Sequence, residues 1–332
     1  MATADQLKAL VRSHGSGDDS QFYSVAMQVA AQAARSGKDK FAQELRDMVD
    51  SLRKDSGRRI DLASIVPVSQ PRGELASLLA VSYPDARMAD LSLSTDVADR
   101  LTQVITEQCQ RDILSRHGLT PVRRLLLVGP PGTGKTSSAR VLAGELGLPL
   151  FAIRLDAIIT KFMGETAAKL RLIFDALVET RGVYLFDEID ALAGHRASSN
   201  DVGEIRRVLN SFLQFLEEDT SESLIVAATN HSQLLDAAIF RRFDTVVTFP
   251  LPDDTIARSV IENRLSAFSL GHLGWARVLD ATRGLSHGEI AIAAENAAKR
   301  SVLSGRNRIL TDDLVSSLKD RPRRHAIVHE HM

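Results

Sequence analysis

The chain has 332 residues, of which 44% are apolar and 25% charged, and its formal net charge is −1. This composition is typical of a folded protein of two or three domains, and it excludes a general electrostatic attraction to nucleic acid or membrane surfaces. No stretch approaches the ~20 apolar residues of a membrane span, the N-terminus lacks a signal peptide, and the single cysteine, Cys109, has no partner for a disulfide, so we expect a cytoplasmic protein.

The N-terminal 55 residues are predicted to form a small helical domain. Amphipathic stretches over residues 4–12, 22–34 and 40–54 are separated by the glycine-containing breaks at Gly15 and Gly37. Residues 56–75 then contain Pro67, Pro71 and Gly73, a composition that indicates a linker.

From residue 76 the pattern alternates between strands and helices. A helix is predicted near residues 96–117, and strands are predicted at 125–128, 150–154, 182–186, 224–229 and 245–249. Such alternation predicts an α/β domain over residues 76–251 whose parallel sheet is sandwiched by helices.

After residue 251 only helical patterns follow, over 255–268, 286–304 and 311–319. We therefore expect a small all-α domain over residues 252–321, followed by an irregular tail over residues 322–332.

The first strand leads into Gly129-Pro-Pro-Gly-Thr-Gly-Lys-Thr136, with a helical pattern behind it. Strand, glycine-rich turn and helix, with Lys and Thr at the helix start, form a nucleoside-triphosphate cradle. Backbone N–H groups and the helix N-terminus face the phosphates, Lys135 brings a full charge to them, and the Thr136 hydroxyl can bind Mg²⁺. The predicted contacts with ATP come from Pro131, Gly132, Thr133, Gly134, Lys135, Thr136 and Ser137.

A second apolar strand ends in Asp187-Glu188-Ile189-Asp190. A carboxylate at the end of a strand beside a phosphate loop can hold Mg²⁺, which is the role predicted for Asp187. Its neighbour Glu188 can orient and deprotonate the attacking water, while Asp190 is interpreted as a structural support for the loop.

Together with three further segments, these motifs make residues 76–320 resemble the AAA ATPases, the branch of the AAA+ superfamily that includes protein unfoldases and disassembly machines. The three segments are Ala227-Ala-Thr-Asn230, Leu235-Asp-Ala-Ala-Ile-Phe-Arg-Arg-Phe-Asp244 and Ser286-His-Gly-Glu-Ile290. The resemblance implies a P-loop ATPase sheet followed by a small helical lid.

The resemblance also implies roles for single residues. Asn230 would hold the attacking water, with a plain helix cap as the alternative. Gly288 would allow close approach to the nucleotide, and Gly118 would contact adenine. His287 would lie near the adenine, or would be a helix-cap or surface residue, and the sequence does not decide between these.

Arg241 and Arg242 match the segment that supplies arginine fingers in the family, where two residues usually separate the arginines. A finger acts on the site of a neighbouring subunit, so the resemblance implies a homo-oligomer, usually a hexameric ring. The alternative is an arginine pair that is salt-bridged to nearby carboxylates.

Lys161, Phe162 and Met163 resemble the central-pore loop of threading AAA proteins, although Phe162 and Met163 could equally belong to a core. A ring of exposed aromatic side chains can grip an extended polypeptide by apolar contact.

Two classes of function follow from the resemblance. The first is an ATP-driven motor that remodels, unfolds or disassembles proteins, with residues 1–55 binding a substrate or adaptor, or serving only as a packing module. The second is a non-threading switch or loader that acts on a protein or nucleic-acid complex. The balanced charge disfavours nucleic acid. A fused protease is disfavoured by the absence of His-Glu-x-x-His, which leaves room for a separate protease partner.

Overall fold

The computed structural model describes residues 26–27, 29–30, 43, 71, 73–158, 163–192, 201–235, 237–306 and 308–329. Contacts divide the chain into two units, residues 1–68 and residues 69–332, with the division inside the segment predicted to be a linker. In the first unit Ala26, Met27, Val29, Ala30 and Gln43 are helical, in agreement with the helices predicted over residues 22–34 and 40–54.

The second unit is built on a six-stranded sheet of order β1-β3-β4-β5-β2-β6. The strands are β1 (Leu79–Ser82), β2 (Arg124–Val128), β3 (Leu150–Ile153), β4 (Val183–Phe186), β5 (Leu224–Thr229) and β6 (Thr245–Thr248). Strands β2 to β6 are parallel, as predicted, but β1 pairs antiparallel with β3. The sheet is therefore mixed. The sequence did not reveal β1 because its four residues follow helix α4 (Leu75–Leu78) without a break and form a partly exposed edge.

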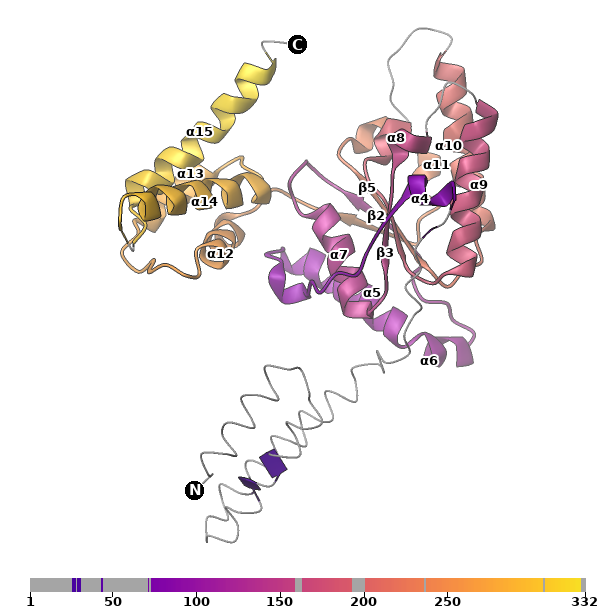
Figure 1. Cartoon of the computed structure of the whole chain (residues 1–332), viewed down its shortest axis with the longest axis horizontal. Coiled ribbons are helices and arrows are strands. Elements are labelled where there is room, and N and C mark those ends of the chain that lie inside the picture. The colour runs from indigo at the N-terminus through magenta and orange to yellow at the C-terminus, as the bar shows by residue number, and fades with distance from the viewer. Residues whose placement is uncertain are drawn as a thin grey trace. The chain divides into compact units, whose positions relative to one another are not determined.

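Helices cover both faces of this sheet (Figure 1). Leu125 and Leu127 of β2 share a core with α5 (Thr95–Cys109) and α7 (Lys135–Leu146). Leu126 and Val128 share the opposite core with α9 (Met163–Glu179) and α10 (Asp201–Glu218). Neighbouring residues of a strand point to opposite faces, so an unbroken apolar run is what a strand buried on both sides requires.

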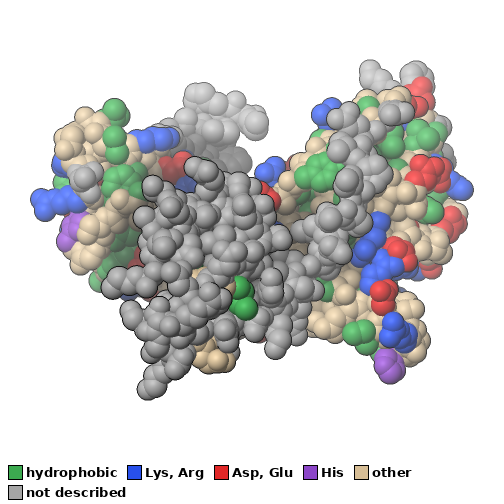
Figure 2. Space-filling view, turned by 60° about the horizontal axis from the view of Figure 1, so that its bottom comes forward, with side chains coloured by type: hydrophobic (Ala, Val, Ile, Leu, Met, Phe, Trp, Pro, Cys, Tyr) green, Lys and Arg blue, Asp and Glu red, His purple; other side chains and the backbone are tan. Residues whose placement is uncertain are grey.

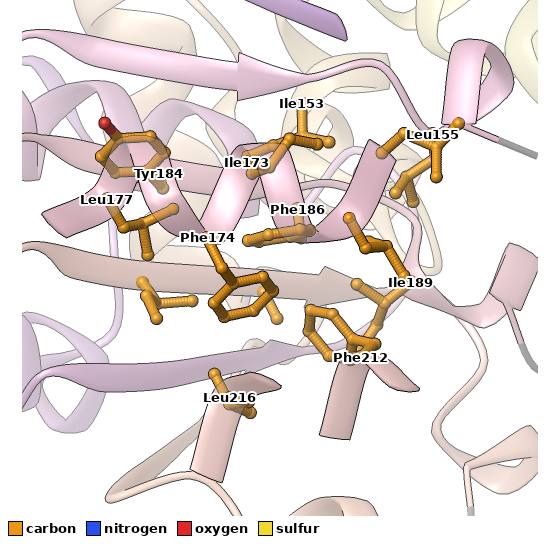
Figure 3. Close-up of a cluster of buried hydrophobic side chains, with 14 of the residues drawn as sticks. Ile153, Leu155, Ile173, Phe174, Leu177, Tyr184, Phe186, Ile189, Phe212 and Leu216 are labelled. Atoms are coloured by element: carbon orange, nitrogen blue, oxygen red, sulfur yellow. The ribbon is translucent and has the colours of Figure 1, made fainter. Parts of the chain in front are cut away.

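Aromatic side chains fill much of the α9–α10 core (Figure 3). The Phe186 and Phe212 rings meet edge to face at 5.0 Å between centroids, and Phe174 contacts both. Phe186 is fully buried and directly precedes Asp187, so this core fixes the end of β4 from which the predicted catalytic carboxylates project.

Short elements complete the α/β region. Helix α8 (Leu155–Ile158), helix α11 (Ala237–Phe240) and the 3-10 turns η1 (Met88–Asp90), η2 (Ile189–Leu192) and η3 (Ser232–Leu234) lie in the connections. The helix predicted near residues 96–117 is two helices, α5 and α6 (Arg111–Arg116), because the Gln110 backbone (φ −103°, ψ 21°) leaves the helical region.

The C-terminal helical region has a core of its own, which includes Ile261, Val278, Ile290 and Leu314. Its helices are α12 (Asp254–Arg264), α13 (Trp275–Thr282), α14 (His287–Leu303) and α15 (Thr311–His329). Helix α13 was not predicted from the sequence.

The prediction of an irregular tail from residue 322 is wrong as far as His329, because α15 runs through that segment. Pro322 lacks an N–H donor but has a fixed φ that a helix accepts, so it weakens the helix without ending it.

On the face shown in Figure 2, basic and acidic side chains are interspersed over the described surface, in keeping with the net charge of −1. Among the described residues, none of the helices is both long enough and apolar enough to cross a membrane.

Candidate nucleotide-binding site

The phosphate loop connects β2 to α7, and its glycines are required by geometry. Gly132 has φ +75°, and a Cβ atom there would lie 2.6 Å from the Ser286 hydroxyl oxygen. Gly134, with φ +103°, is the N-cap of α7, which begins at Lys135. Only glycine adopts such backbone angles without strain, so the loop can turn tightly and present its N–H groups.

Lys135 is buried, with 5% of its surface exposed, and its ammonium group is held by three oxygen atoms. Nζ donates to the carbonyl oxygens of Gly129 (2.7 Å) and Pro130 (2.8 Å) and to Asn230 Oδ1 (2.8 Å). Burial lowers the pKa of Lys135, and the negative charges of Asp187, Asp190 and Glu188 oppose that shift. A cation fixed in this way is suited to binding phosphate oxygens.

Thr136 and Asp187, predicted separately as Mg²⁺ ligands, are brought together by the fold. Thr136 Oγ1 donates to Asp187 Oδ2 at 2.6 Å, which joins the start of α7 to the end of β4. A hydroxyl and a carboxylate oxygen are hard donors of the kind that Mg²⁺ prefers when phosphates supply further ligands. The pair therefore fits the predicted ion.

Glu188 has φ +54°, and it is the one non-glycine residue with positive φ among the described residues. Its N–H donates to Asp187 Oδ1 at 3.0 Å, and its exposed side chain lines the same cavity as Lys135. Strained backbone at a polar residue is a feature that clusters at catalytic sites.

Asp190 joins the ends of β4 and β5. Its Oδ1 accepts from Thr229 Oγ1 at 2.9 Å and from the Asn230 N–H at 3.3 Å. The predicted structural role of Asp190 is confirmed. Because the Asn230 amide oxygen bonds to Lys135, its NH₂ group is the part that can donate to a water or phosphate oxygen.

One cavity of about 830 Å³ collects the predicted phosphate and catalytic residues and extends to the helical region. The predicted residues that line it are Pro131, Gly132, Thr133, Gly134, Lys135, Thr136, Ser137, Asp187, Glu188, Asn230 and Gly288. Gly288 closes onto the phosphate loop, since its N–H donates to the Gly132 carbonyl at 2.9 Å.

Gly118 does not line this cavity. It follows α6 with φ +71°, is exposed, and a Cβ atom there would meet nothing within 4 Å. Its conformation ends a helix, so the structure gives no support to the predicted adenine contact. Residues 89–93 form the corresponding wall.

That wall and its partners in the helical region were not predicted from the sequence. The Ser92 hydroxyl lies 3.0 Å from the Ser259 hydroxyl and accepts from Asn263 Nδ2 at 3.1 Å. Asn263 and His287 also line the cavity. These residues belong to no local pattern, and only packing brings them together.

The adjacent arginines differ in their surroundings. Arg242 Nη1 donates to Glu217 Oε1 of α10 at 2.7 Å, the kind of salt bridge considered above as the alternative. Arg241 is exposed and makes no hydrogen bond or ion pair among the described residues. Of the predicted pore residues, Lys161 and Phe162 lie outside the described residues, and Met163 is the first residue of α9.

Comparison with known proteins agrees with this geometry. Residues 125–251 match the family model "ATPase family associated with various cellular activities (AAA)". The uncharacterized AAA family ATPase y4kL of Sinorhizobium fredii is 32% identical over 98% of this chain and 97% of its own length. The crystal structure of the FIGL-1 AAA domain shares the fold, with a TM-score of 0.60 and 21% identity over 82% of this chain and 95% of that one.

Two further relatives are longer than the matched region. The ATP-dependent zinc metalloprotease FtsH of Lancefieldella parvula is 33% identical over 69% of this chain, which spans 37% of that protein. The proteasome-activating nucleotidase of Saccharolobus solfataricus is 31% identical over 62% of this chain, which spans 55% of that protein. The nucleotide cavity and the full-length match to y4kL lead to one conclusion: the chain belongs to the AAA family of ATPases, and it binds and hydrolyses ATP.

Proposed function

We propose that this protein is an ATP-driven motor that remodels, unfolds or disassembles other proteins, with ATP and Mg²⁺ at the cavity described above. The observation that carries the proposal is that one cavity is lined both by the phosphate loop and by helices α12 and α14. A nucleotide there would touch both regions, so hydrolysis can change how they are held, which is the basis of a motor.

The chemistry assigned to the site uses residues that the fold places together. Thr136 and Asp187 would hold Mg²⁺, which neutralises phosphate charge when bound. Glu188 orients and deprotonates the attacking water, and the Asn230 amide positions it. Lys135 holds the phosphates throughout, since its ammonium group is fixed by protein oxygens.

The proposal includes a homo-oligomeric ring, for which a hexamer is the expected form. Arg241 supports this part, because an exposed arginine without a partner among the described residues is available to a neighbouring subunit. Two relatives carry names tied to proteolysis, FtsH metalloprotease and proteasome-activating nucleotidase, and these support a protein client and a separate protease partner. The single cysteine, Cys109, is in keeping with the reducing cytoplasm, which we propose as the location.

The experiment that tests threading is cryo-electron microscopy of the Glu188→Gln protein with ATP, Mg²⁺ and fluorescein-labelled casein as a model client. We expect a ring with extended chain density against Phe162. Phe162→Ala should keep ATP hydrolysis and lose casein unfolding, whereas Phe162→Tyr should retain both because the aromatic grip is preserved.

A ring with an empty pore, or an open assembly that holds its partner through the N-terminal helices, would overturn threading. That result would favour the alternative function, a non-threading ATP-dependent switch or loader.

A further inference from the structure

His287 is the first residue of α14, and its backbone is fixed against the phosphate loop. The Ser286 hydroxyl caps the helix by accepting from the Glu289 N–H at 3.4 Å, while the Glu289 carboxylate accepts from the Ser286 N–H at 2.8 Å. The next residue, Gly288, donates its N–H to the Gly132 carbonyl at 2.9 Å. A side chain at position 287 is therefore held at a defined point of the cavity wall.

The His287 ring lines the cavity but turns both of its nitrogens away from it. Nδ1 and Nε2 are buried, and neither has a hydrogen-bond partner of normal geometry among the described residues. Since the nitrogens have no exposed surface, the part of the ring that meets the cavity is carbon. Burial lowers the pKa of His287, with the Ser92 backbone opposing the shift, so the ring is neutral near pH 7.

The position of His287 along the cavity indicates which part of a nucleotide it meets. The charged groups Lys135, Asp187 and Glu188 lie at the end where the phosphate loop meets the strands. His287 lies with Val260 and Asn263 in the part lined by the helical region, where no acidic residue of the described lining is found. A triphosphate bound to the loop leaves the nucleoside to occupy this second end.

We propose that His287 is a specificity-determining residue that provides a neutral aromatic surface against which the purine base stacks. The proposal rests on the nucleotide site described above and adds the means by which this chain selects a flat, two-ring base. Stacking needs a π-face and no hydrogen bond, which agrees with a ring whose nitrogens are buried.

The test is equilibrium binding of ATP, CTP and inorganic tripolyphosphate to the full chain and to His287→Ala, His287→Phe and His287→Asn. We expect His287→Ala to weaken ATP binding about tenfold, with a smaller effect on CTP and none on tripolyphosphate, which has no base. His287→Phe should bind ATP as the parent chain does, because it keeps the aromatic surface. Lys299→Ala, an exposed change on the same helix, is the matched control and should leave all three affinities unchanged.

Three results would overturn the proposal. Rescue by His287→Asn but not by His287→Phe would assign a hydrogen bond in place of stacking. Equal weakening of ATP and tripolyphosphate would assign a general distortion of the lid, and unchanged ATP binding in His287→Ala would remove the residue from recognition. A parent chain that binds neither ATP nor tripolyphosphate would instead overturn the nucleotide site itself, and this is a separate outcome.

Discussion

At the scale of single residues, the arginine pair shows how neighbours in sequence acquire different roles. Arg242 is held by Glu217 within the chain, whereas Arg241 is exposed. An exposed salt bridge contributes at most about 1 kcal/mol to stability, so Arg242 acts mainly by bracing the segment that carries Arg241. We therefore expect Arg241 to be the residue that completes a neighbouring active site.

Arg241→Ala should lower the ATP hydrolysis rate by about 10³-fold or more, with ATP affinity unchanged, since a finger stabilises charge only in the transition state. Arg242→Ala should have a much smaller effect. Mixing Arg241→Ala subunits with Lys135→Ala subunits should restore part of the activity, because each supplies what the other lacks. A larger loss in Arg242→Ala, measured in the same assay, would reverse the assignment.

His287 provides a second residue-scale prediction, which concerns pH. Its folded-state pKa lies below the unfolded value of about 6.5, so below that pH the unfolded chain binds a proton that the folded chain resists. The protein should therefore lose stability as the pH falls from 7.5 to 5.5. The fall in Tm over this interval should be smaller in His287→Phe, and equal falls in the two proteins would contradict the prediction.

At the scale of elements, the connection between β1 and α5 is fitted to α7 at Gly144. A Cβ atom at Gly144 would lie 2.2 Å from the Ala86 carbonyl oxygen. Arg87 Nη1 donates to the Gly144 carbonyl at 2.6 Å, and the Met88 N–H donates to Glu145 Oε1 at 2.8 Å. The same connection continues into the cavity wall at Ser92, so its fit to α7 sets the shape of the nucleoside end.

Gly144→Ala should lower the free energy of unfolding by ~1–3 kcal/mol through overpacking, although alanine is the better helix former by ~1 kcal/mol. It should also weaken ATP binding by displacing Ser92. Chemical denaturation and nucleotide titration measure the two effects. Gly271→Ala is the matched control, because a Cβ at Gly271 meets nothing within 4 Å, and a loss of equal size there would refute the packing argument.

At the scale of the whole molecule, the two contact units have separate tasks in the proposal. Residues 69–332 contain the described nucleotide cavity, and residues 1–68 form the other unit. Removing residues 1–55 should leave basal ATP hydrolysis unchanged and abolish binding of a client or adaptor. Hydrolysis assays and client capture by the full and shortened chains measure this, and unchanged capture would assign the N-terminal helices a passive packing role.

The sequence predicted the phosphate end of the site well, for a physical reason. Gly132, Lys135 and Thr136 act through one continuous strand-turn-helix, and Asp187 and Glu188 directly follow a fully buried strand. Five strands were predicted near their observed positions because strands buried on both faces are continuous apolar runs. The short edge strand β1 and the helix α13 lacked such a signal.

That this chain binds a nucleoside triphosphate could be predicted without any structure, because the chemistry of a phosphate loop is carried by contiguous residues whose backbone angles and charges follow from their types. The surroundings of the rest of the nucleotide depend on the fold. Ser92, Asn263 and His287 come from three separate segments and meet through packing of the lid region. The fold also distinguishes Arg241 from Arg242, since a salt bridge to Glu217 depends on how α10 lies against α11, and no local pattern records that distance.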